Sequence, residues 1–215
     1  MPIHKLRGFY DSSWWSCTHK AKSPENKHTP KKLYSVNEKK SRENYTRVTS
    51  VLYPFSGLEK IDAQIVAHAA ERGTKVHKIC EGIIQGLGEL GVEEETRPYV
   101  ESFKQWWEKG HEVIMMEQRF WCDELEITGQ VDLIIKTPEG LAIVDLKTSR
   151  KPSATWAAQG AAYAYLAKKA GHDIQKIFFL HLLRTGKEAK IYEYPIDDSF
   201  FFAILRVWNH FYKAA

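Results

Sequence analysis

The sequence has little cysteine and no long apolar run, and each of these features excludes certain classes of protein. Its three cysteines, Cys17, Cys80 and Cys122, lie far apart without C-x-x-C spacing. Their number excludes a disulfide framework and any four-thiolate zinc or iron–sulfur centre. No apolar stretch approaches the roughly 18–20 residues that span a bilayer, and residues 1–5 begin no secretory signal. We therefore expect an intracellular protein with reduced thiols and no membrane partner.

Charge is divided unevenly along the chain. Residues 1–50 hold eight Lys and three Arg against one Asp and three Glu, a net charge of +7. The whole chain carries +4, so residues 51–215 sum to −3. The polar stretch 1–46 is expected to form a basic, partly irregular arm, which either neutralises the phosphates of a polyanion or is a solvated tail. Residues 47–215 are expected to form one domain, because they suffice for one good core.

Hydrophobic spacing predicts alternating helices and strands in that domain. The expected helices cover 58–70, 74–84, 96–109 and 153–170, with a last one from about 197. The expected strands cover 112–122, 126–136, 141–147, 176–184 and 189–195. Gly73 is expected to break the first helix from the second, which Thr74 would cap. The order of elements predicts an α/β fold with a central mixed sheet flanked by helices.

Charged residues interrupt two of the apolar strands. Asp145 and Lys147 share one face of the strand 141–147, because side chains alternate along a strand. Asp132 lies in an apolar run on the preceding strand. Two carboxylates on neighbouring strands can hold a hard divalent cation. The plain alternative is an exposed Asp–Lys pair, worth roughly 0–1 kcal/mol, beside an unrelated acid.

The three residues have a common chemical use. A divalent ion lowers the pKa of bound water and offsets the charge that develops on phosphorus. Lys147, two residues beyond one carboxylate, can hold the attacking water or stabilise the transition state. Glu117 lies among apolar residues of the strand 112–122 and is a candidate for a further acid near the ion. The residues therefore predict a site for phosphodiester hydrolysis.

Four sequence elements, in a fixed order, extend this set. They are Arg72-Gly73-Thr74-Lys75-Val76-His77, then Gly129-Gln130-Val131-Asp132, then Val144-Asp145-Leu146-Lys147-Thr148-Ser149, and finally Gln159 with Tyr163 as Q-x-x-x-Y. With them, residues 47–195 resemble the PD-(D/E)XK nuclease superfamily. Within it they are similar to the RecB-like exonuclease branch, including phage-type exonucleases and the mitochondrial genome maintenance exonuclease. The resemblance implies a restriction-endonuclease-like core.

The resemblance also implies a role for each matched residue. Asp132, Asp145, the Leu146 backbone carbonyl and His77 would be metal ligands, and Lys147 would be the catalytic lysine. Gln159 and Tyr163, four residues apart on one helical face, would bind the DNA backbone or position the active-site carboxylates. The cofactor would be Mg²⁺ or Mn²⁺, and an imidazole ligand favours Mn²⁺. Several relatives in this branch carry a four-cysteine iron–sulfur cluster, which three cysteines cannot hold.

The expected function is therefore that of a metal-dependent deoxyribonuclease, more exo- than endonucleolytic. Its expected partner is DNA, either single-stranded or at its ends, in recombination, repair or phage DNA processing. Two alternatives stay open. One is a catalytically silent nuclease fold that serves as a DNA-binding or assembly module. The other is a metal hydrolase that acts on a small phosphoester.

Overall fold

The computed structural model describes residues 42–213 of the chain. The predicted basic arm therefore lies almost wholly outside the described residues. The strands are β1 (Thr46–Arg47), β2 (Glu112–Cys122), β3 (Ile127–Thr137), β4 (Gly140–Lys147), β5 (Ile174–His181) and β6 (Lys190–Tyr194). The α-helices are α1 (Val48–Leu52), α2 (Ala63–Ile84), α3 (Arg97–Trp107), α4 (Trp156–Lys169) and α5 (Ser199–Trp208). Short helical turns at Arg42–Asn44, Tyr53–Phe55, Leu58–Lys60 and Asn209–Lys213 complete the order.

The six strands form one mixed sheet. Its order is β1-β3-β4-β5-β6, and β2 pairs with β3 outside this path. The pairs β1·β3 and β4·β5 are parallel, whereas β2·β3, β3·β4 and β5·β6 are antiparallel. The prediction of a mixed sheet flanked by helices is confirmed.

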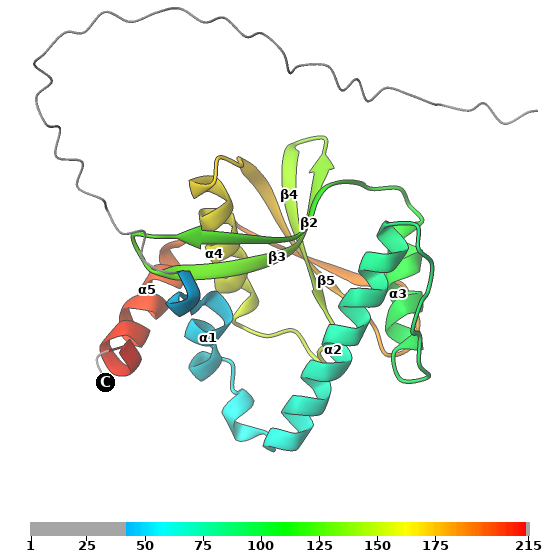
Figure 1. The fold of residues 1–215 in the computed structure, drawn as a ribbon, viewed down its shortest axis with the longest axis horizontal. Coiled ribbons are helices and arrows are strands. Elements are labelled where there is room, and N and C mark those ends of the chain that lie inside the picture. Colours follow the sequence, from blue (N-terminus) through cyan, green and yellow to red (C-terminus); the bar gives the residue numbers. More distant parts are fainter. Residues whose placement is uncertain (1–41, 214–215) are drawn as a thin grey trace, which may run out of the picture. The chain divides into compact units, whose positions relative to one another are not determined.

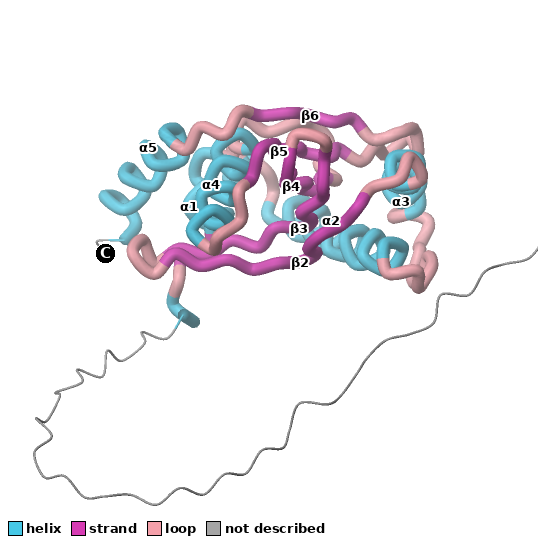
Figure 2. Tube along the Cα trace, turned by 90° about the horizontal axis from the view of Figure 1, so that it is seen from above, coloured by secondary structure: helices cyan, strands magenta, loops and turns pink. Residues whose placement is uncertain are grey.

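Helices cover both faces of the sheet, with α1, α4 and α5 on one side and α2 and α3 on the other (Figure 1, Figure 2). Two buried apolar clusters correspond to these two layers. The α4 cluster includes Ile143 and Phe179, and the α2–α3 cluster includes Val144 and Leu180. Neighbouring residues of β4 and β5 thus contribute to opposite clusters, as strand alternation requires. No helix among residues 42–213 has both the length and the apolar character of a membrane span.

One expected boundary is wrong. The predicted break at Gly73 does not occur, because α2 runs without interruption from Ala63 to Ile84. Its cap is Asp62, whose Oδ1 accepts from the backbone N–H of Gln64 at 2.8 Å. Thr74 lies inside the helix, where its hydroxyl donates to the Ala70 carbonyl at 3.1 Å. A glycine inside a helix costs only about 1 kcal/mol, which the packing of α2 outweighs.

The described cysteines, Cys80 and Cys122, are free and buried. Cys80 belongs to the α2–α3 cluster and Cys122 to the α4 cluster. Burial raises the pKa of the Cys80 thiol. Both side chains therefore serve as small apolar core residues, and Cys17 lies outside the described residues.

Candidate metal centre

The site forms where β3 and β4 separate. Their last paired residues are Leu133 and Val144. Beyond that point the backbone N–H of Leu146 donates to Asp132 Oδ2 at 2.7 Å, and the Leu146 carbonyl lies 3.1 Å from His77 Nε2. The backbone groups that a continued ladder would have paired are instead satisfied by two side chains. These two contacts join β3, β4 and α2 at the point where the strands separate.

The alternation of side chains is interrupted at one position of the β2·β3 pair. Glu117 has φ 51°, which is rare for a residue other than glycine. It lies opposite Asp132, between the paired positions Met116↔Leu133 and Gln118↔Val131. Val131 packs in the α4 cluster but Leu133 in the α2–α3 cluster, so the side chains exchange faces at this point. Glu117 and Asp132 are the residues at which the side chains change from one face of the sheet to the other.

Three potential metal ligands meet there. One ligand atom from each of His77, Glu117 and Asp132 lies within 4.8 Å of the others. His77 Nδ1 is 3.4 Å from Asp132 Oδ1. Gln130 Nε2 donates to Glu117 Oε2, and Gln130 Oε1 accepts from the Arg119 guanidinium. Gln130 and Arg119 thus hold the Glu117 carboxylate toward the other two ligands.

The first half of the site is the group of His77, Glu117 and Asp132. The second half lies on β4 and α4 and consists of Asp145, Lys147, Gln159 and Tyr163. Lys147 Nζ lies 2.6 Å from Asp145 Oδ2. The Gln159 amide accepts from Lys147 Nζ at 3.1 Å and donates to Asp145 Oδ1 at 3.2 Å and to the Tyr163 hydroxyl at 3.0 Å. Tyr163 reaches this position because Gly129 lies beneath its ring, where a Cβ would come within 2.7 Å of Tyr163 Cε1. Gln159 therefore contacts the aspartate and the lysine directly, and Tyr163 contacts Gln159.

In the first half of the site, the charges of His77 and Asp132 stabilise each other. Burial opposes protonation of His77, but the Asp132 carboxylate outweighs it and raises the pKa of His77 to about 9. Burial alone would raise the pKa of Asp132, and the charged His77 ring lowers it below the ordinary value. In the metal-free protein at neutral pH an imidazolium therefore lies between Asp132 and the Leu146 carbonyl.

The pKa of Asp145 is shifted in the opposite direction from that of Asp132. Burial raises its pKa to about 6, against the lowering effect of Lys147 and together with repulsion from Asp132. Its Oδ2 atom is buried and lies 2.6 Å from the Lys147 ammonium. Burial and Asp132 also raise the pKa of Glu117, and burial raises the pKa of Tyr163. Crowded acids with raised pKa values are favourable surroundings for a cation.

The donor set fits a divalent ion of the Mg²⁺ or Mn²⁺ type. Carboxylate oxygens, a backbone carbonyl and one imidazole are ligands that such ions accept. Asp132 and Asp145 are close enough to repel each other, and a cation between them would relieve this repulsion. The Asp145 carboxylate is turned to Lys147, outside the group that His77, Glu117 and Asp132 form.

The structure brings every sequence-predicted site residue to the junction of β2, β3, β4, α2 and α4. Gln159 and Tyr163 are buried, so of the two roles predicted for them their contacts match positioning of the carboxylate. Sequence reasoning missed the part that Gln130 plays, although Gln130 is in the quoted Gly129–Asp132 element. Its signal was a polar residue in a strand two positions before an acid, which alone is too common to be informative.

A comparison with known protein families agrees with this arrangement. The family model described as "PD-(D/E)XK nuclease superfamily" matches residues 57–211, which include the whole site. Among solved structures, one titled "Crystal structure of SSO0001" is 18% identical, with a TM-score of 0.43, over 80% of this chain and 77% of that chain. A search of curated proteins found no match.

Proposed function

The chain belongs to the PD-(D/E)XK nuclease superfamily, and from this premise we propose that it is a divalent-metal-dependent deoxyribonuclease. The superfamily generally comprises metal-dependent nucleases, and the fold is the restriction-endonuclease-like one expected from the sequence. The observation that carries the proposal is the meeting of His77, Glu117 and Asp132 within 4.8 Å, beside the Asp145–Lys147 pair. An exposed Asp–Lys pair without function does not account for this cluster, because Asp145 is 2% exposed.

The proposed ligands are Asp132, Asp145, His77 and the Leu146 carbonyl, with Glu117 as a further acid. A divalent ion held there would activate a water molecule and offset the negative charge that develops on phosphorus. His77 must lose its proton before a ring nitrogen can donate a lone pair. The same step frees Asp132 Oδ1, which lies 3.4 Å from His77 Nδ1.

Lys147 is proposed as the catalytic lysine. Its ammonium is 2.6 Å from Asp145 Oδ2 and is also held by Gln159. The buried hydrogen bonds of Gln159 and Tyr163 fix both side chains before substrate binds, which is the preorganisation that electrostatic stabilisation needs. From this place Lys147 can donate a hydrogen bond to the attacking water or to a phosphoryl oxygen.

We further propose exonucleolytic action on DNA ends or single strands, as in the RecB-like branch. The support is the order of the four sequence elements, from the His77 element to Q-x-x-x-Y. The contact of Gln159 with Asp145, and that of Tyr163 with Gln159, are consistent with such a motif.

The test is degradation of oligonucleotides that carry a label at the 5′ or the 3′ end, single-stranded or duplex, with Mg²⁺ or Mn²⁺. The wild-type protein should release short products progressively from one end, and EDTA should abolish their release. The double variant Asp145→Ala/Lys147→Ala should release none above background. Cleavage that survives this double substitution contradicts the proposal.

The matched control is the double variant Glu139→Ala/Lys187→Ala, which removes one acid and one lysine from the exposed surface. It should degrade DNA at the wild-type rate. DNA binding without hydrolysis by the wild-type protein, under every metal condition, would favour the silent DNA-binding module instead. Internal cleavage of a circular single strand would replace exonucleolytic by endonucleolytic action.

A further inference from the structure

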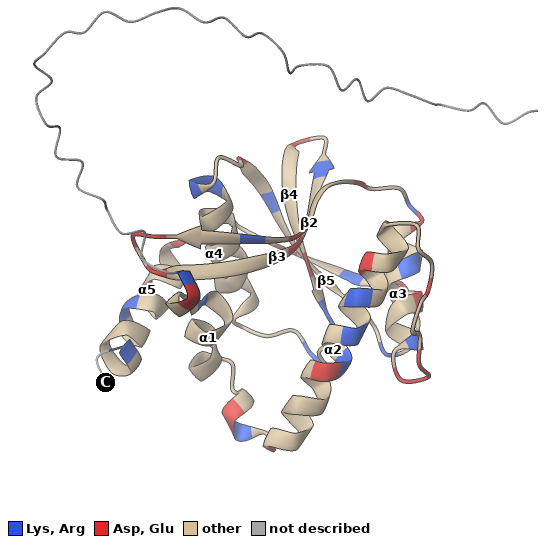
Figure 3. Cartoon of the chain, viewed as in Figure 1, with Lys and Arg blue, Asp and Glu red and all other residues tan. Residues whose placement is uncertain are grey.

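Cations concentrate along the middle turns of α2 and on the loop beside it (Figure 3). Two of those on α2 are already neutralised. Arg72 lies 3.2 Å from Glu95, and Lys75 lies 3.4 Å from Glu71 and 3.1 Å from Glu93. These pairs leave little positive charge to attract a further anion.

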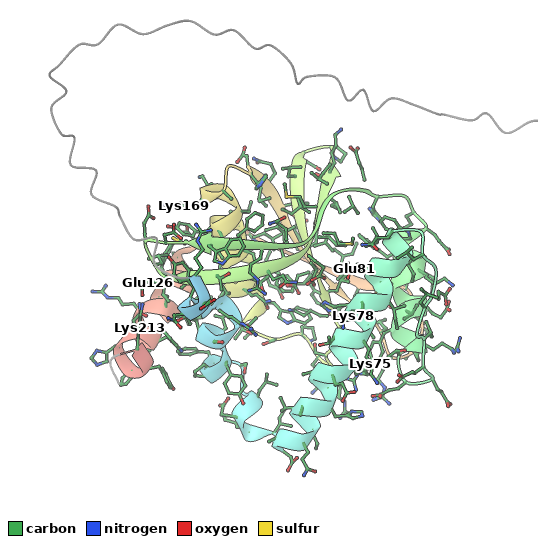
Figure 4. All side chains as sticks on the ribbon, viewed as in Figure 1. Lys75, Lys78, Glu81, Glu126, Lys169 and Lys213 are labelled. Carbon is green, nitrogen blue, oxygen red and sulfur yellow. The ribbon has the colours of Figure 1, made fainter. Side chains whose placement is uncertain are left out.

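Lys78 differs from both. It follows His77 directly, about 100° further around the helix, and its side chain is exposed. The nearest acid on the helix, Glu81, accepts a hydrogen bond from Gln85 at 3.2 Å, and Lys78 forms no ion pair with any residue from 42 to 213. Figure 4 shows Lys75, Lys78 and Glu81 along α2, with Glu81 nearest to the sheet. Lys78 is thus an unneutralised cation next to a proposed ligand.

Two more cations follow Lys147 on the β4–α4 loop. Arg150 and Lys151 are exposed, and within the described part of the chain neither has a carboxylate partner. The loop itself is held firmly. The Ser149 carbonyl lies 2.6 Å from His181 Nε2, and the Ser149 hydroxyl donates to the Lys151 carbonyl at 2.9 Å.

The loop and α2 are in contact. Thr148 is buried against Gly73, where a Cβ would come within 3.3 Å of Thr148 Oγ1. A Cβ at this position would be in tight contact with the hydroxyl, so the glycine favours the close approach of the helix and the loop. Lys78 follows Gly73 by five residues on α2, and Arg150 follows Thr148 by two residues on the loop. The contact therefore joins the two segments that carry the three cations.

Some cations far from the site in sequence, such as Lys60 and Lys187, also have no ion-pair partner among residues 42–213, whereas others are neutralised. A groove of about 530 Å³ beside β2 is lined by Arg42 and Lys169 among others. There Arg42 lies 3.1 Å from Asp123, and Lys169 lies 2.6 Å from Glu124. Folded domains commonly neutralise exposed cations in this way. What distinguishes Lys78, Arg150 and Lys151 is their place, because they follow His77 and Lys147 closely in the chain. Cations without a carboxylate partner beside a centre of buried acids favour an anionic ligand.

We infer that Lys78, Arg150 and Lys151 bind backbone phosphates of the nucleic acid that flank the scissile bond. The inference rests on the proposed function, because it takes the substrate to be a polymer with a phosphate at every nucleotide. Each contact releases counterions from the nucleic acid, so affinity falls with salt in proportion to the number of contacts. These side chains supply affinity and register, whereas hydrolysis belongs to the metal centre.

The test measures fluorescence anisotropy of a labelled single-stranded oligonucleotide at several salt concentrations, in Ca²⁺, with a denaturing gel to verify that the DNA stays intact. The variant Lys78→Gln/Arg150→Gln/Lys151→Gln should bind at least tenfold more weakly. Its slope of log affinity against log salt should be smaller by about 2, since each phosphate contact on a single strand contributes about 0.7. The control Lys75→Gln/Lys169→Gln/Lys176→Gln removes three cations that are paired with Glu71 and Glu93, Glu124 and Glu193.

The control has the same net charge as the test variant and should keep the wild-type slope. Equal slopes for the two triple variants overturn the inference, as does an absence of salt-dependent binding by the wild-type protein. Hydrolysis by the wild-type protein in Mn²⁺ is measured separately. If hydrolysis is present while the slopes are equal, only the phosphate contacts are wrong. If hydrolysis is absent, the proposed function fails as well.

Discussion

Asp132 and Asp145 are both buried and lie on neighbouring strands, yet their surroundings shift their pKa values in opposite directions. Asp132 faces a charged imidazole and a backbone N–H. Asp145 faces one ammonium and an amide, and it also feels the charge of Asp132. The difference shows that two acids with similarly low exposure need not have the same protonation, because each depends on its own partners.

The two halves of the site also differ in how they are held. His77, Glu117 and Asp132 lie where β3 and β4 separate, and each is held by its own partner, His77 and Asp132 by the Leu146 backbone and Glu117 by Gln130. In the second half, hydrogen bonds run from Lys147 through Gln159 to Tyr163, between β4 and α4. We therefore expect the first half to determine affinity for the cation, and the second half to determine the rate once the cation is bound.

Substitution of Lys147 should separate the two halves most clearly. Lys147→Met keeps the volume of the side chain but removes the ammonium, so the rate of hydrolysis should fall about 10³-fold, in the range seen for loss of one preorganised donor. Binding of Mn²⁺, measured by calorimetry, should persist, because no proposed ligand is removed. Recovery of the rate at high Mn²⁺ would contradict this division.

Substitution of His77 should have the converse result. His77→Ala removes one proposed ligand and should weaken Mn²⁺ binding by at least about 10–100-fold, the cost of losing only a residue that orients a ligand. The lost hydrolysis should return as Mn²⁺ is raised, since Lys147 and Asp145 are intact. His68→Ala, an exposed histidine on the same helix, is the control and should behave as wild type. A His77→Ala protein that no concentration of metal restores would place His77 in the chemistry itself.

Proton linkage gives a third, smaller effect. The folded metal-free chain holds a proton on His77 up to a pKa of about 9, whereas an unfolded chain releases it near 6.5. The folded state therefore binds more protons between these values, and the free energy of unfolding should fall as pH rises through this window, by about 1–3 kcal/mol. Asp145 contributes with the same sign between pH 3.8 and about 6.

Urea denaturation in EDTA at pH 6.5, 8 and 9 measures this fall. The free energy of unfolding of the His77→Gln variant should change less over the same pH range, because glutamine does not titrate. Added Mn²⁺ should reverse the trend in the wild-type protein, since the ion competes with the proton for the ring. An equal decline in wild type and His77→Gln would show that other groups carry the linkage.

Much of the fold and the set of site residues could be predicted from the sequence, and the geometry of the site could not. The strand 112–122 was predicted with its observed bounds, and the alternation on β4 gave the common face of Asp145 and Lys147. Both follow from local periodicity. The unbroken course of α2 through Gly73 does not, because it depends on tertiary packing that outweighs a local propensity.

The exchange of faces at Glu117 was also out of reach. Strand alternation assumes extended backbone, and Glu117, with φ 51°, departs from it at the point where the faces change. Glu117 was a candidate from its apolar neighbours alone. That it lies opposite Asp132, tied to Gln130 and Arg119, depends on a distortion that no local pattern encodes.

The smallest expected effect tests the outermost member of the second half. Tyr163→Phe removes a hydroxyl that accepts one hydrogen bond from Gln159 and keeps the ring that packs over Gly129. Because Gln159 still has Asp145 and Lys147 as partners, stability should fall by only about 1 kcal/mol. The rate should fall severalfold at saturating Mn²⁺, with metal affinity unchanged. Tyr165→Phe, on the same helix but against Phe202, should leave the rate as in wild type. A Tyr163→Phe protein that lost metal affinity and kept its rate would mean that α4 supports the ligands, and the separation between the two halves would be wrong.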